Sequence, residues 1–95
     1  MTTIKVMRIT KETSDNFTKN KTEIISELTR DYGYRVFTAR EGDPLTLYVE
    51  GNFESHIPRS VNIVLAKYKA ESEVVATLDE MSMQYLLSRT MSRIR

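Results

Sequence analysis

His56 is the residue whose type most readily supports acid–base chemistry, because it is the single histidine of the chain. It stands in a predicted loop, beside Ser55 and shortly before Pro58. A catalytic histidine needs a nucleophile or an orienting acid nearby. A histidine on its own in a loop is most often a solvated side chain. We therefore predict no catalytic residue and expect that the protein is not an enzyme.

Acidic residues form two short groups that could contact a cation. Glu41 and Asp43 flank Gly42 at a predicted hairpin tip, and Asp79-Glu80 opens a predicted helix. Hairpin tips are polar in any case, and acids in a first helical turn compensate the helix dipole. Zinc and iron sites need more histidine or cysteine than one histidine and no cysteine. No glycine-rich phosphate loop is present, so we expect neither a metal nor a cofactor.

The element that organises these residues is a predicted hairpin over residues 34–50. Two runs rich in β-branched and aromatic residues flank a polar turn that contains Gly42 and Pro44. Side chains alternate between the two faces of a strand. One face of the second run therefore carries Leu45, Leu47 and Val49 toward the core. The other face carries Thr46, Tyr48 and Glu50.

The segment before the hairpin predicts a strand and then a helix. Residues 4–9 are rich in apolar residues and read as a central strand, followed by a polar connector over 10–13. Ser14 and Asp15 are suitable helix N-caps, and Gly33 is suitable as the helix stop. Between them an apolar stripe at helical spacing predicts a helix over 14–32; it comprises Phe17, Ile24, Ile25, Leu28 and Tyr32, with Lys21 as its polar member.

The second half of the chain is more ambiguous. Residues 58–71 fit both a helix and an alternating strand, and their good helix formers favour the helix, with Pro58 at its start. Residues 73–78 predict a short strand, and a last helix begins near Asp79. The alternative is one long helix from about Ser72. The order predicts an α+β fold, a ferredoxin-like βαββαβ antiparallel sheet with helices on one face, plus an extra C-terminal helix.

Composition limits the setting and the class of protein. The 95 residues predict a single domain over 1–95, and the net charge of +1 is too small to indicate nucleic acid or a membrane surface by itself. The absence of cysteine fits a reducing compartment. Neither a signal peptide nor a run of transmembrane length is evident. We therefore expect a cytoplasmic protein that does not enter a membrane.

Aromatic and basic residues could gather on the open face of the predicted sheet. If the strand faces coincide, that face carries Lys5, Met7, Arg35, Phe37 and Tyr48. In outline this resembles RNA-recognition-motif proteins, which stack bases on an open sheet. Residues 45–50 lack the Lys/Arg-Gly-aromatic-Gly/Ala-Phe pattern of that family, so membership is not inferred. Lys5, Arg35, Phe37 and Tyr48 are nevertheless candidates for contacting single-stranded RNA or DNA. Packing under the last helix or against a second copy is the favoured alternative.

The predicted C-terminal helix carries two apolar groups. One face, which we expect to be buried, comprises Met83, Leu86, Leu87, Met91 and Ile94. Met81 and Tyr85 lie on another face, with Arg89 near them, and methionine recurs at surfaces that bind partners. We therefore predict a protein partner or homo-oligomer contacted through Met81, Tyr85 and Arg89.

These observations favour a small non-enzymatic protein–protein interaction module, acting through the C-terminal helix and the open sheet face. Its size and its lack of cofactor motifs resemble those of small bacteriophage proteins that bind and inhibit host factors. Single-stranded RNA or DNA binding on the open sheet face is the alternative function.

Overall fold

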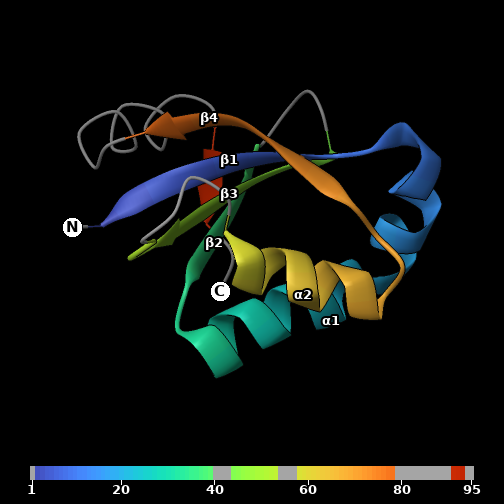
Figure 1. Ribbon diagram of the computed structural model, residues 1–95, viewed down its shortest axis with the longest axis horizontal. Coiled ribbons are helices and arrows are strands. Elements are labelled where there is room, and N and C mark those ends of the chain that lie inside the picture. The colour runs from blue at the N-terminus through green and yellow to red at the C-terminus, as the bar shows by residue number, and fades with distance from the viewer. Residues whose placement is uncertain (1, 40–43, 54–57, 79–90, 94–95) are drawn as a thin grey trace.

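The computed structural model describes residues 2–39, 44–53, 58–78 and 91–93 (Figure 1). Its elements follow the order strand, helix, strand, strand, helix, strand, and a final short strand. In sequence they are β1 (Thr3–Ile9), a 3-10 turn (Lys11–Thr13), α1 (Ser14–Tyr32), β2 (Arg35–Ala39), β3 (Thr46–Gly51), α2 (Arg59–Lys67), β4 (Ser72–Leu78) and β5 (Met91–Arg93). The predicted helix over 14–32, the two paired strands of the hairpin, the helix within 58–71 and the strand over 73–78 are thereby confirmed, whereas residues 40–43 of the hairpin turn lie outside the described part of the chain.

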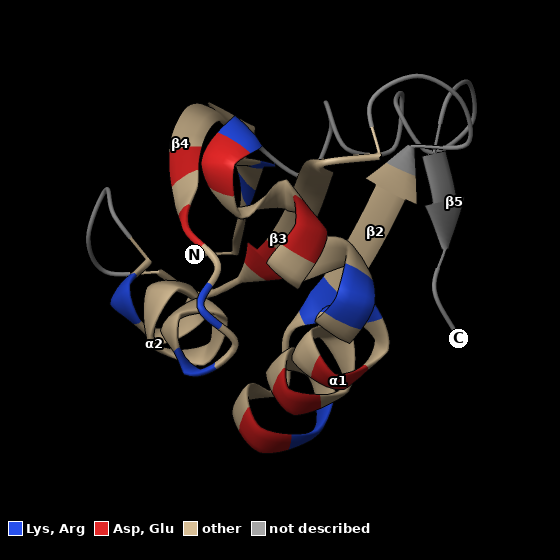
Figure 2. Ribbon diagram, turned by 90° about the vertical axis from the view of Figure 1, so that its right-hand side faces the viewer, with Lys and Arg blue, Asp and Glu red and all other residues tan. Residues whose placement is uncertain are grey.

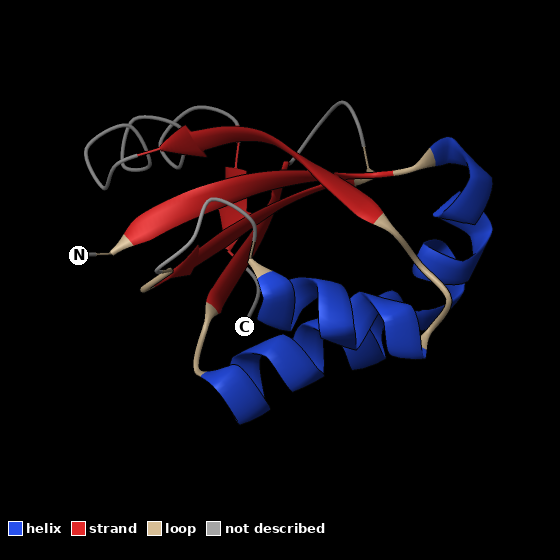
Figure 3. Cartoon of the chain, in the orientation of Figure 1, coloured by secondary structure: helices blue, strands red, loops and turns tan. Residues whose placement is uncertain are grey.

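The strands form one sheet in the order β4-β1-β3-β2-β5. Each neighbouring pair is antiparallel. Both helices lie on the same side of this sheet, with α2 under β4 and α1 toward β2 (Figures 2 and 3). The fold is therefore α+β with an antiparallel sheet, as predicted, and β1 is central.

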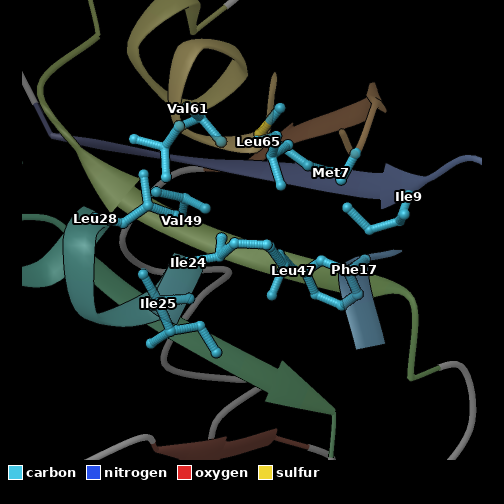
Figure 4. Close-up of a cluster of buried hydrophobic side chains, with 13 residues drawn as sticks. Met7, Ile9, Phe17, Ile24, Ile25, Leu28, Leu47, Val49, Val61 and Leu65 are labelled. Atoms are coloured by element: carbon cyan, nitrogen blue, oxygen red, sulfur yellow. The ribbon is translucent and has the colours of Figure 1, made fainter. Parts of the chain in front are cut away.

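The main core fills the space between the sheet and the two helices (Figure 4). Leu47 and Val49 of β3 point into it, as the alternation predicts, and both are fully buried. The helices contribute the spaced apolar residues of their inner faces, namely Phe17, Ile24, Ile25 and Leu28 from α1 and Val61, Val64 and Leu65 from α2. The helical spacing thus identified this part of the core correctly.

The N-terminal end of α1 differs from the prediction. Thr13 is the N-cap residue and makes no side-chain cap bond. The Ser14 hydroxyl instead donates to the carbonyl of Lys11, 2.9 Å away, because the 3-10 turn leads directly into the helix. Neither Ser14 nor Asp15 is the N-cap.

The C-terminal end of α1 combines one confirmed prediction with one correction. Gly33 ends the helix with a φ of 70°, a left-handed conformation that costs glycine little. Tyr32 was expected on the buried stripe, but it is 41% exposed and stacks on Tyr34. The stripe is therefore buried from Phe17 to Leu28 but not at Tyr32, the last residue of α1.

The C-terminal helix prediction is wrong where the structure describes this region. Met91–Arg93 form strand β5, and Met91 lies in register with Ala39 of β2. Three residues of extended chain are incompatible with a helix that continues through Met91. The remaining residues of that prediction, 79–90 and 94–95, lie outside the described part of the chain. No described helix is both long enough and apolar enough to cross a membrane.

Candidate functional site

The face of the sheet that points away from the helices, here called the outer face, brings three predicted residues together. Phe37 of β2 lies opposite Tyr48 of β3, and Arg35 lies opposite Glu50. Because residues two apart share a face, these side chains form one continuous group. The structure therefore places Arg35, Phe37 and Tyr48 on a common surface, as the sequence predicted.

Lys5 and Met7 lie on the opposite, inner face of the sheet, which corrects their predicted position. Lys5 is in register with Val49, and Met7 with Leu47, so all four side chains share one face. Met7 is fully buried in the main core, and Lys5 is 5% exposed. The ammonium group of Lys5 donates to the Thr77 hydroxyl, 3.1 Å away. Lys5 therefore does not join Arg35 and Tyr48 in a basic surface.

The outer face has a small apolar cluster of its own. Ile4 is 0% exposed and Phe37 is 1% exposed, and Tyr48 and Leu78 pack against them, partly buried. A base can stack on a ring only if that ring is open to solvent. Phe37 therefore lacks the exposure that a nucleic-acid stacking platform needs.

The described charges of the outer face are balanced. Arg35 Nη1 lies 3.2 Å from Glu50 Oε1, and its guanidinium carbon lies 5.5 Å from the centre of the Phe37 ring. Arg8 of β1 is in register with Glu73 of β4. A groove that follows a phosphate backbone needs cations without neighbouring acids. The described side chains of this face do not provide one.

One edge of the sheet is formed by β4, whose only strand neighbour among the described residues is β1. The N–H of Thr10 donates to the carbonyl of Glu71, 3.0 Å away, which directs that carbonyl toward β1. Backbone polar groups alternate in direction along an antiparallel strand. The N–H and C=O groups of Ser72 and Val74 therefore point away from β1, toward the side on which no described strand pairs with β4.

The side chains of β4 leave this edge largely uncovered. The pairing with β1 shifts register so that Val6 faces Ala76 and Met7 faces Val74, which leaves Val75 as an extra residue at a bulge. Val75 is 53% exposed. At the opposite end of the sheet, β5 has three residues, whereas β4 has seven. Short edge strands discourage pairing with other chains, and long apolar ones invite it.

A shallow hollow adjoins the start of β4, between that strand and α2. Its volume is about 310 Å³, and it is lined by Asn62, Ala66, Ala70, Glu71 and Ser72. The Ser72 hydroxyl lies 3.4 Å from Oδ1 of Asn62, which joins the two walls. Ile63, one residue further on α2, is 57% exposed. An edge strand beside a hollow and a helix is the general geometry used by domains that bind an extended segment.

A polar contact between the helices holds α2 in place beside this edge. Glu27 of α1 accepts hydrogen bonds from Lys67 Nζ at 2.8 Å and from the Tyr68 hydroxyl at 2.7 Å. The bond from Lys67, and then that from Tyr68, lowers the pKa of the Glu27 carboxyl below its ordinary value. These bonds connect α1 to the C-terminal end of α2.

Aromatic side chains meet at the other end of the helices. The rings of Tyr34 and Phe53 lie 5.0 Å apart, and the Tyr34 hydroxyl forms a short hydrogen bond with Ser60. This contact links the residue before β2 to the beginning of α2. The helix predicted to start at Pro58 begins at Arg59, with Pro58 as its N-cap, whose carbonyl accepts hydrogen bonds from the N–H groups of Val61 and Asn62.

Several predicted residues lie outside the described part of the chain. They are His56, Glu41, Asp43, Asp79 and Glu80, together with the proposed partner contacts Met81, Tyr85 and Arg89. Among the described residues, no group of three histidine, cysteine, aspartate or glutamate side chains is arranged to hold a metal ion.

The β4 edge was missed by the sequence reasoning, although a signal for it existed. The predicted βαββαβ order places the last strand at the border of the sheet. The run Glu73-Val74-Val75-Ala76-Thr77-Leu78 then contains one charged residue and no proline. An edge strand with so little protection is a candidate pairing surface.

No family model, curated protein or solved structure matches this chain.

Proposed function

We propose that this chain is a small, non-enzymatic protein-interaction module whose main described contact surface is the β4 edge. We define that edge as the side of Ser72–Leu78 turned away from β1, together with the adjoining flank of α2 that carries Asn62 and Ala66. The observation that carries the proposal is the exposure of β4 along this edge, with Val75 53% exposed at its bulge. Met81, Tyr85 and Arg89 remain proposed partner contacts.

The fold class supports this proposal. We assign β1 to β4 and the two helices to a ferredoxin-like arrangement, in which the first strand is central and the fourth strand is at an edge. The strand order and the antiparallel pairings agree with that assignment. In such a sheet an added strand can lengthen the hydrogen-bonded ladder without any change in the core.

Site-specific photo-crosslinking in cells tests the proposal. A benzophenone amino acid replaces Val75 on the β4 edge or, as the control, Thr22 on the exposed side of α1. We expect a discrete cross-linked protein band from position 75 and none from position 22. Equal labelling at both positions, or no band at position 75, would contradict a protein contact at this edge.

Single-stranded nucleic-acid binding is the second candidate, and Tyr48 is the observation that favours it. Tyr48 is partly exposed beside Arg35, whose side chain is 54% exposed. The burial of Phe37 and the pairing of Arg35 with Glu50 weigh against it. Anisotropy of labelled RNA and DNA oligonucleotides at low and high salt decides between the two. Salt-sensitive binding that is lost in Arg35→Gln and retained in Arg30→Gln would favour this second function.

A further inference from the structure

We infer that the β4 edge pairs with the β4 edge of a second copy of this chain, giving a two-fold dimer with one continuous sheet. This inference rests on the proposed interaction function and names the partner for the same surface. The outward N–H and C=O groups of Ser72 and Val74 supply both donors and acceptors. An edge of this kind complements an antiparallel copy of itself, as a two-fold interface requires.

The single charge of β4 selects the register. Glu73 is the only charged residue in Ser72–Leu78. A two-fold axis at Glu73 would place two carboxylates directly opposite each other, which is destabilising. An axis at Val74 lets the outward groups of each Val74 bond to those of the other copy. Glu73 then lies opposite Val75 of the second copy, so its carboxylate avoids a like charge.

Two of the three exposed large apolar side chains among the described residues, Val75 and Ile63, lie at or near the proposed contact, whereas Tyr32 on α1 does not. The described large apolar residues that remain exposed are Ile63, Val75 and Tyr32. Val75 lies beside the proposed axis. Ile63 lies three residues before Ala66 on α2, so the two side chains are neighbours on the helix surface. Ala66 lines the hollow next to β4. A two-fold axis at the edge brings α2 of each copy toward the other, on the same side of the joined sheet.

The use of the same edge on both copies favours a dimer rather than a fibre. Antiparallel pairing of β4 with itself uses the same edge on both copies and therefore closes after two chains. Growth beyond two copies through the β4 edge is thus disfavoured. At the other end of the sheet the structure describes only Met91–Arg93 of β5.

Sedimentation equilibrium of the full chain, from low micromolar to millimolar protein, tests the inference. We expect reversible dimerisation, weakened about tenfold or more by Val75→Lys, which places a charge beside the axis. Ile63→Lys serves as a second variant on α2. Tyr32→Lys is the matched control, since it replaces an exposed apolar residue on α1, and it should leave the dimerisation constant unchanged. Thermal melts of each variant verify folding.

Three results overturn the inference. They are a wild-type chain that stays monomeric throughout, a Val75→Lys chain that dimerises like wild type, and a Tyr32→Lys chain that loses dimerisation equally. A monomeric wild type that still cross-links to another protein from position 75 would remove self-pairing while leaving the proposed interaction function intact.

Discussion

The guanidinium of Arg35 lies over the ring of Phe37, 5.5 Å from its centre. The same guanidinium is paired with Glu50 at 3.2 Å. Of the basic residues predicted to contact nucleic acid, Arg35 is more exposed than Lys5. Its guanidinium group, however, already contacts Phe37 and Glu50 on the same sheet. Because Arg35 is paired in this way, the outer face is a weaker candidate for a binding surface than the β4 edge.

Arg35→Ala should destabilise the fold by about 0.5–1 kcal/mol, because it removes an exposed ion pair and a cation–π contact that are each modest. Urea unfolding measures the change, with Lys19→Ala on the exposed side of α1 as the control. If Arg35→Ala has no more effect than Lys19→Ala, the contacts of Arg35 carry no net stability.

Leu47→Ala and Ile25→Ala should each cost about 2–5 kcal/mol, because both side chains are buried in the main core and truncation leaves a cavity. Thr22→Ala, an exposed position of α1, should change stability by less than about 0.5 kcal/mol. Chemical denaturation of the three variants compares them directly. A surface-like loss at Leu47 would mean that β3 presents its other face to the helices.

Gly51→Ala should destabilise the protein by about 1–3 kcal/mol through overpacking. A Cβ at Gly51 would lie 2.5 Å from Cδ1 of Tyr34 and 3.2 Å from Cζ of Phe53. A double-mutant cycle with Tyr34→Ala tests this cause, because removing the ring removes the clash. Additive losses would show that the ring of Tyr34 is not what Gly51 accommodates.

Acid should weaken the contact between the helices. The pKa of Glu27 is lower in the folded state than its ordinary value of 4.5, chiefly because Lys67 and then Tyr68 donate to it. The ionised carboxylate therefore stabilises the fold above that value, and this contribution is lost as the pH falls through the folded pKa. Unfolding curves from neutral to acid pH should show a smaller pH dependence for Glu27→Gln than for wild type. Thr22→Ala, a non-titrating control at an exposed position of α1, should retain the wild-type dependence.

Local patterns predicted most of the secondary structure, because each local signal agreed with the tertiary packing. The stripe from Phe17 to Leu28 and the alternation of Leu47 with Val49 are examples. Lys5 was misplaced because its strand is apolar on both faces, so alternation alone could not assign a lysine to one of them.

The candidate site was harder to predict than the fold because it depends on neighbours that are distant in sequence. The sequence predicts Phe37 as a residue that could stack on a base, but in the folded sheet it is buried in one cluster with Ile4. The free edge of β4 depends on which strands pair, and the bulge at Val75 depends on a register shift against β1. The spacing of residues within one segment predicts neither the strand order nor the bulge.

Amide hydrogen exchange of β4, followed by NMR in dilute and concentrated protein, tests the central claim most directly. The outward N–H groups of Ser72 and Val74 should exchange quickly in dilute solution and become protected when a partner strand adds to the edge. The N–H of Tyr34, which is bonded to the carbonyl of Leu28, reports any general change in stability. Protection of Ser72 and Val74 that rises with concentration while Tyr34 stays constant is the predicted result. Exchange at Ser72 and Val74 that is equally fast at every concentration would contradict pairing of the β4 edge with a second copy.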